Sequence, residues 1–131
     1  MTQLPLTALV TLMICRLVMA TGINVGRARG LYGIKAPAVT GHELFERAYR
    51  IQRNTLENAV LVLPALWLYG GFIGDRGAAA LGAVWLLARI GYAIAYQKDP
   101  AKRGPSFGLS VLAFAGLAAG GLWGVIKVLT A

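Results

Sequence analysis

The sequence has 131 residues, of which 57% are hydrophobic and 14% charged, and its mean hydropathy is +0.63. This composition is too apolar for an ordinary soluble domain and leaves no room for a separate soluble module. The net charge of +8 does not indicate a nucleic-acid partner, because the basic residues gather around two connections between apolar segments. A single cysteine, Cys15, excludes a disulfide framework and a thiolate metal cluster, and we expect it to pack inertly within an apolar span.

Four stretches are apolar enough, or nearly so, to cross a membrane: Leu4–Val25, Leu56–Gly74, Ala78–Tyr96 and Phe107–Leu129. A span needs about 20 mostly apolar residues. We therefore predict an all-α membrane protein, with residues 1–131 forming a single integral-membrane domain. Its fold is an antiparallel four-helix bundle, with helices at about 4–25, 42–70, 77–98 and 105–129.

The predicted connections follow from glycine and proline residues. Residues 22–41 contain several glycines and Pro37, which predict an irregular segment. Gly70–Asp75 is predicted to be a tight turn, and Asp99-Pro100 to begin a short loop. Glycines 116, 120 and 124 repeat every four residues, a pattern that lets helices approach closely. The first span lacks a basic segment before it and contains Arg16, so we expect it to be retained rather than cleaved as a signal peptide.

The basic residues predict an orientation in the membrane. Nine of the thirteen flank the first and third connections: Arg27, Arg29, Lys35, Arg47, Arg50, Arg53, Lys98, Lys102 and Arg103. By the positive-inside rule these two connections face the cytoplasm, and both termini lie on the opposite side with Arg76. We expect a multi-pass protein of a bacterial inner membrane.

The second predicted helix begins with a polar face, since six of its residues fall within roughly a 100° sector. They are Glu43, Glu46, Arg50, Arg53, Asn54 and Glu57. Pairs one turn apart, Glu46 with Arg50 and Arg53 with Glu57, are predicted to form ion pairs. This set can be read as a structural ladder of salt bridges, with tyrosines that anchor the membrane interface.

The third predicted helix adds Arg89, Tyr92 and Tyr96 on one face, and Arg103 follows it. Arginines and amides that converge at the cytoplasmic end of the predicted bundle fit a small anionic ligand with a peptide-like body. Arg16 is a separate candidate: it is either functional or paired with a carboxylate, for which Glu57 lies at the matching depth.

The segment from Phe45, FERAYRIQRNTLEN, is followed by LPALWLYGGF and GAAALGAVWLLAR. Together these motifs resemble the MAPEG family, the membrane-associated proteins in eicosanoid and glutathione metabolism. The microsomal glutathione transferase and cysteinyl-leukotriene synthase branch is most similar. The resemblance spans roughly residues 25 to 125 and implies a homotrimer of four-span subunits, with glutathione bound between neighbouring subunits near the cytoplasmic side.

The same resemblance implies roles for individual residues. Arg103 would stabilise the glutathione thiolate as the catalytic residue, with Lys102 as the nearest alternative. Arg50 would bind a carboxylate of glutathione, and Tyr92 and Tyr96 would come from a neighbouring subunit. The remaining glutathione-binding residues would be Arg29, Gln52, Asn54, Glu57 and Asn58, the last in place of a tyrosine of the synthase.

The predicted function is a membrane-bound glutathione transferase, with an accompanying peroxidase activity left open. Glutathione is the co-substrate and no metal is expected, because His42 is the only histidine. The second substrate would be a lipophilic electrophile or lipid hydroperoxide that arrives through the membrane lipid, as in detoxification. Two alternatives remain: a non-catalytic glutathione- or lipid-binding relative, and a small four-helix multidrug transporter. The transporter is disfavoured because Arg16 stands where a proton-coupling carboxylate is needed.

Overall fold

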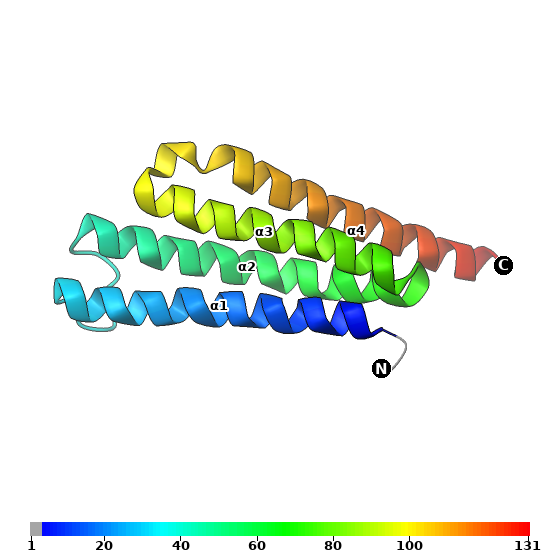
Figure 1. Ribbon diagram of the computed structural model, residues 1–131, viewed down its shortest axis with the longest axis horizontal. Coiled ribbons are helices and arrows are strands. Elements are labelled where there is room, and N and C mark those ends of the chain that lie inside the picture. The colour runs from blue at the N-terminus through cyan, green and yellow to red at the C-terminus, as the bar shows by residue number, and fades with distance from the viewer. Residues whose placement is uncertain (1–3) are drawn as a thin grey trace.

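A computed structural model describes residues 4–131 as a bundle of four long helices (Figure 1). The elements are α1 (Pro5–Tyr32), α2 (Glu43–Phe72), α3 (Asp75–Lys98), the short 3₁₀ helix η1 (Pro100–Lys102) and α4 (Gly104–Thr130). Successive long helices run in opposite directions, so the α1–α2 and α3–α4 connections lie at one end of the bundle (Figure 1). The predicted all-α, four-helix architecture is confirmed.

Helices α2 and α3 form the centre of the bundle, because each packs against the other three long helices. The buried residues of α2 recur every three or four positions, which places them on one face of the helix. At mid-bundle Leu66 of α2 meets Ile14 of α1, Trp85 of α3 and Leu117 of α4, and all four side chains are fully buried. This packing fixes the position of α2, and with it the polar residues in the first turns of that helix.

Helix α1 continues to Tyr32, so the prediction that residues 22–41 form an irregular connection is wrong for their first half. A lone glycine inside a helix costs only about 1 kcal/mol relative to alanine. Packing offsets this cost, because Ala28 is buried against Phe45 and Ala48 of α2. The helix ends at Gly33, whose φ of 68° is the left-handed conformation that glycine adopts most easily.

The α2–α3 turn is shorter than predicted, whereas the loop after α3 begins at Asp99-Pro100 as predicted. Helix α2 extends to Phe72 and includes Gly70, so the predicted turn over Gly70–Asp75 is reduced to residues 73–74. After α3, Asp99 accepts a hydrogen bond from the backbone nitrogen of Ala101 at 3.1 Å and caps η1. This short link holds Arg103 close to the end of α3.

The glycine repeat on α4 packs against helices of the same chain. Gly120 faces the ring of Tyr69, and Gly116 faces Leu81. A Cβ atom at Gly124 would lie 2.5 Å from the Cβ of Phe72, so only glycine allows this approach of α4 to α2. The repeat is thus used within the bundle and gives no sign of contacts between subunits.

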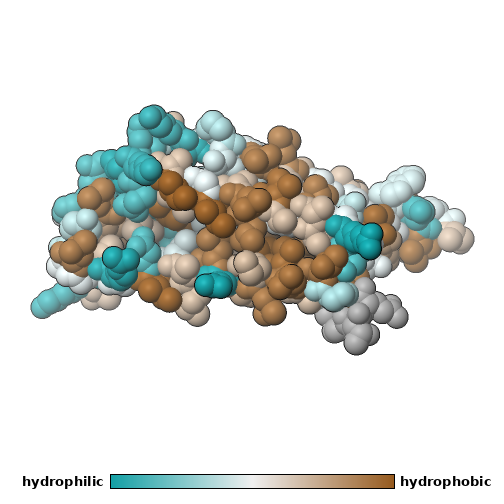
Figure 2. Space-filling view, in the orientation of Figure 1, coloured by the Kyte–Doolittle hydropathy of each residue, from teal (hydrophilic) through white to brown (hydrophobic). Residues whose placement is uncertain are grey.

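The surface of the bundle is apolar around its middle. Helices α1, α3 and α4 are long and apolar enough, by length and composition, to cross a membrane, whereas α2 carries charges over its first turns. Leu12, Leu87 and Leu112 are each about two-thirds exposed. Figure 2 shows hydrophobic residues across the middle and hydrophilic ones at the end that holds the α1–α2 and α3–α4 connections. This distribution is typical of a bundle surrounded by lipid.

Candidate functional site

Three predicted site residues from distant parts of the chain line one cavity of about 460 Å³. Asn54 lies on α2, Tyr92 lies on α3, and Arg103 directly precedes α4. Ala101, Gly104 and Phe107 complete the lining. Because η1 is short and packs against α3, Arg103 lies near the end of α3 and can line the same cavity as Tyr92.

An adjacent cavity of about 320 Å³ contains Arg50 and Tyr96. It adjoins the first one because Arg50 and Asn54 are one turn apart on α2, and the Tyr92 and Tyr96 ring centroids are 5.6 Å apart. We call the two cavities together the polar cleft, defined by Arg50, Asn54, Tyr92, Tyr96 and Arg103. All five residues belong to one chain here, and the approach of Tyr92 and Tyr96 to α2 of a neighbouring subunit stays a prediction.

The end of the cleft near Arg103 combines a cation with aromatic rings. The Cζ atom of Arg103 lies 5.7 Å from the Tyr96 ring centroid, and its Nη1 donates to the carbonyl of Pro100. Tyr92 is buried and its ring centroid is 6.1 Å from that of Phe107. Because Arg103 is itself exposed, its charge is available to an anion that enters the cleft.

Next to the cleft, buried Arg89 and Thr55 and half-buried Asn54 and Asn58 form a hydrogen-bond cluster. Arg89 Nη2 donates to Asn54 Oδ1 at 2.8 Å and to Thr55 Oγ1 at 2.9 Å. Asn58 Nδ2 donates to the Asn54 carbonyl at 2.8 Å and to Asn54 Oδ1 at 3.3 Å. Arg89 was placed by sequence on the Tyr92 face but was given no role. The signal for it was a lone charge in the middle of an apolar span.

Three predicted site residues lie away from the cleft. Gln52 is about 200° around α2 from Arg50 and lines an apolar cavity of about 450 Å³ beside α1. Arg29 donates to the Ala38 carbonyl at 2.7 Å and stands over the Phe45 ring at 5.0 Å, so it braces the α1–α2 connection. Glu57 is exposed, 3.8 Å from Arg53, as the predicted ion pair requires.

One predicted ion pair, Glu46 with Arg50, is wrong. Within residues 4–131 the salt bridges join Arg53 to Glu57 and Arg47 to Glu43, so Glu46 does not pair with Arg50. Glu46 instead accepts from the backbone nitrogen of Gly41 at 3.3 Å, since the chain folds back over the start of α2.

Arg16 is exposed and forms neither of those salt bridges, because Glu57 is on the Arg53 side of α2. Cys15 lies within α1 and is exposed, so it is not packed in the interior of the single chain. His42 begins α2 as its N-terminal cap: its Nδ1 accepts from the Leu44 backbone nitrogen at 3.1 Å, and its ring stacks on Tyr32.

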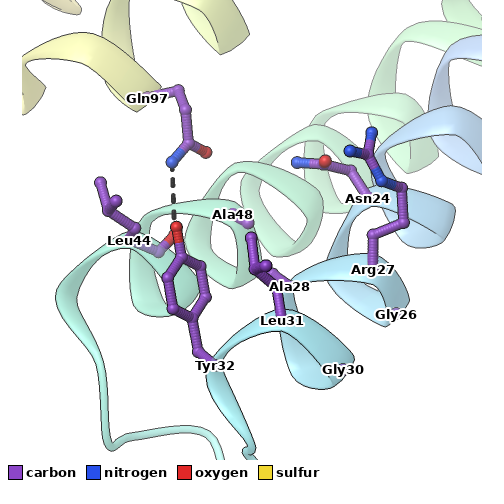
Figure 3. A pocket seen from close by; sticks show the side chains of 10 residues that line it. All are labelled: Asn24, Gly26, Arg27, Ala28, Gly30, Leu31, Tyr32, Leu44, Ala48 and Gln97. Atoms are coloured by element: carbon purple, nitrogen blue, oxygen red, sulfur yellow. Dashed lines mark hydrogen bonds between the residues drawn. The ribbon is translucent and has the colours of Figure 1, made fainter.

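A separate cavity of about 510 Å³ opens between α1, α2 and the end of α3 (Figure 3). Asn24, Arg27 and Tyr32 of α1 lie on one side, and Gln97 of α3 reaches across to donate to the Leu44 carbonyl at 3.3 Å. None of the predicted site residues lines this cavity. Size alone therefore does not identify the site. In residues 4–131 no three His, Cys, Asp or Glu side chains are grouped so that they could hold a metal ion.

Comparison with known proteins places the chain among membrane proteins of one family. The MAPEG family model matches residues 7–123. An uncharacterized protein from Synechocystis sp. is 45% identical over 125 residues, which cover 95% of this chain and 91% of that protein.

Two relatives with named activities are also similar. Microsomal glutathione S-transferase 2 from Mus musculus is 40% identical over 88 residues, 67% of this chain and 60% of that enzyme. Leukotriene C4 synthase from Bos taurus is 36% identical over 101 residues, 77% of this chain and 67% of that enzyme. The match thus spans less than two thirds of the length of the mouse transferase. With its apolar helices and this match, the chain is an integral membrane protein that belongs to the MAPEG family.

Proposed function

We propose that the protein is a membrane-bound glutathione transferase that joins the thiolate of glutathione to lipophilic electrophiles. The observation that carries the proposal is the polar cleft, in which Arg50, Asn54, Tyr92 and Arg103 lie together on one chain. Glutathione has two carboxylates, two peptide groups and a thiol, and the cleft offers arginines, amides and tyrosines to match. The relatives named above include a glutathione S-transferase, which supports the same conclusion.

Binding follows from the positions of the polar groups. Arg50 is exposed at the outer part of the cleft, where its guanidinium can bind a carboxylate with two parallel hydrogen bonds. Asn54, one turn further along α2, would contact the peptide body, and Asn58 a turn beyond it donates to the Asn54 carbonyl. Glu57 lines neither cavity, but it is exposed one turn from Asn54, where it suits the amino group of a ligand that extends out of the cleft. The thiol then extends toward Arg103.

The chemical step requires a thiolate. A free thiol has a pKa near 8.5, so only a few per cent is ionised at neutral pH. Arg103 is always protonated and cannot act as a base, but its charge favours the anion. Lowering the thiol pKa by about two units requires roughly 2.7 kcal/mol. The proton leaves to solvent, the thiolate sulfur attacks the electrophilic carbon, and the leaving group departs with its bonding electron pair.

We further infer that the working form is a homotrimer. Gln52 and Arg29 lie outside the cleft of their own chain, so they can serve glutathione only from a neighbouring subunit. The exposed apolar side chains of α1 and α2, such as Met19 and Val60, provide a surface for such a neighbour. Native mass spectrometry in detergent should give a trimer, and a monomer or an antiparallel dimer would reject this assembly.

The second substrate is apolar and reaches the thiolate laterally from the lipid. Electrophilic lipids and lipid hydroperoxides fit this route, which suggests detoxification and an accompanying peroxidase activity. The basic residues flanking the α1–α2 and α3–α4 connections support a cleft that faces the cytoplasm, where glutathione is abundant.

The test is glutathione binding by the purified protein in detergent, followed by conjugation of an activated aryl halide. Saturable binding in calorimetry and formation of the thioether are the expected results. Binding without turnover would favour the alternative of a non-catalytic glutathione-binding relative, since binding residues can persist without catalysis. Absence of binding would reject both. The family match leaves the multidrug-transporter alternative without support.

A further inference from the structure

Arg89 is a cation in the interior of the bundle without a carboxylate partner. Its side chain is fully buried, and the salt bridges of residues 4–131 do not include it. Nη2 makes its two hydrogen bonds, while Nε and Nη1 are buried without any partner. Burial of an uncompensated charge is unfavourable, and an apolar residue of similar size is often equally stabilising or better. Stability of the fold therefore does not explain this side chain.

The hydrogen bond from Arg89 determines which way the Asn54 amide faces. A guanidinium can only donate, so the atom of Asn54 that meets it must be the oxygen. The same oxygen also accepts from Asn58 Nδ2, which occupies its second lone pair. Within residues 4–131 the Nδ2 of Asn54 has no hydrogen-bond partner, and Asn54 lines the cavity. The group it offers to a ligand is thus a donor.

Arg89 also contacts Tyr92, a second residue that lines the same cavity. Its Cζ atom lies 4.0 Å from the centroid of the Tyr92 ring, a cation–π contact in the bundle interior. Tyr92 is buried and lines the cavity together with Asn54 and Arg103. The buried side chain of Arg89 therefore contacts both Asn54 and Tyr92, a polar and an aromatic residue of the cavity lining.

We propose that Arg89 is a positioning residue of the glutathione site, which orients Asn54 so that its amide nitrogen donates to a carbonyl or carboxylate oxygen of the ligand. This inference rests on the proposed function and adds a polarity to it: at Asn54 the ligand presents an oxygen, not an N–H group. Burial of the Arg89 charge is unfavourable, and in return Asn54 and Tyr92 are already oriented before glutathione binds.

The first experiment changes Asn54 and leaves Arg89 in place. Asn54→Asp can still accept from Arg89, but it turns a carboxylate oxygen toward the ligand where the amide nitrogen was. We expect its glutathione affinity, measured by calorimetry, to be on the order of tenfold below that of Asn54→Ala, because an acceptor then faces an acceptor. Its ligand-free melting temperature should equal or exceed that of wild type. Affinity equal to or above wild type would show that Asn54 accepts from the ligand and would overturn the proposal.

The second experiment removes the positioning group. Arg89→Met should leave the ligand-free melting temperature unchanged or raised, yet weaken glutathione binding on the order of tenfold. In an Asn54→Ala background the same change should cost little further affinity, because the residue through which Arg89 acts is already absent. Arg89→Lys, which keeps one donor and the charge, should recover part of the affinity.

Three results would overturn the proposal: unchanged affinity in Arg89→Met, an equal loss in the Asn54→Ala background, or a fall in melting temperature with failure to fold. The last would assign Arg89 a structural role, and Asn54→Asp still reports the polarity of the site in that case. If wild-type protein does not bind glutathione, the proposed function and this inference both fall. If wild type binds and the variants behave like it, only this inference fails.

Discussion

Asp75, the first residue of α3, accepts hydrogen bonds from the backbone nitrogen and the hydroxyl of Thr7, each at 2.8 Å. A second carboxylate oxygen accepts from the backbone nitrogen of Leu6 at 3.1 Å. The N–H groups in the first turn of a helix have no partner within the helix, and a negative charge there is favourable. Leu4, which precedes α1, cannot cap it with a side chain. A residue 68 positions away in sequence from Thr7 therefore caps α1.

Asp75→Ala should lower the melting temperature of the protein in detergent by a few degrees, because two backbone N–H groups of α1 lose their acceptor. The measurement is thermal unfolding followed by circular dichroism. Asp99→Ala is the matched control, since Asp99 caps only the short η1 helix, and it should have a smaller effect. Equal shifts for the two variants would show that the long-range cap contributes no more than the local cap of η1.

Gly124→Ala should destabilise the bundle by about 1–3 kcal/mol, the usual cost of overpacking. The new methyl group would lie 2.5 Å from the Cβ of Phe72, which cannot move without its backbone. Gly108→Ala on the same helix has open space around the added atom and should stabilise by up to about 1 kcal/mol through helix propensity. Denaturation in mixed micelles distinguishes the two, and a stabilised Gly124→Ala would contradict the packing.

Arg50→Ala should weaken glutathione binding by roughly 1.5–3 kcal/mol, the range for a hydrogen bond to a charged group. Arg50 lines the polar cleft, whereas Arg53 on the same helix is exposed and pairs with Glu57. Arg53→Ala is thus the matched control and should change affinity much less. Calorimetry on both variants tests the assignment, which fails if Arg53→Ala shows the larger loss.

Arg103→Ala should bind glutathione nearly normally and lose turnover. The interaction that it removes is with the thiolate rather than with the resting thiol, so the loss appears in the chemical step. Ultraviolet difference absorbance reports the thiolate, beside the conjugation rate. Lys102→Ala removes the neighbouring charge and should retain both signals, because Lys102 does not line the cleft. Full thiolate signal and full rate in Arg103→Ala would transfer the role to Lys102 or a tyrosine.

Cysteine labelling should place Lys35 and Lys102 on the cytoplasmic side and Arg76 on the other. The natural Cys15 is exposed, so it is first replaced by serine. An impermeant thiol reagent applied outside intact cells should modify a cysteine at position 76 and spare those at 35 and 102. The reverse pattern would show that the polar cleft faces outward.

Much of the fold could be read from the chain because it depends on local patterns. Apolar runs of membrane length predict four helices, and the basic residues beside two connections show which ends lie together. The error at residues 22–32 has one cause: glycine propensity predicts a break, but packing of Ala28 against Phe45 is stronger than that local preference. A sequence pattern does not contain the surface on which a weak helix segment packs.

The candidate site shows the same division. By sequence alone, helical periodicity placed Arg50, Asn54 and Glu57 on one face of α2, and Tyr92 and Tyr96 on one face of α3, since residues three or four apart share a side. Only the tertiary structure brought Asn54, Tyr92 and Arg103 around one cavity and separated Gln52 and Arg29 from it. Only the tertiary structure also showed that Arg89 donates to the Asn54 oxygen. Such a contact depends on the distance between two helices and on the rotation of each about its own axis, which a sequence pattern does not give.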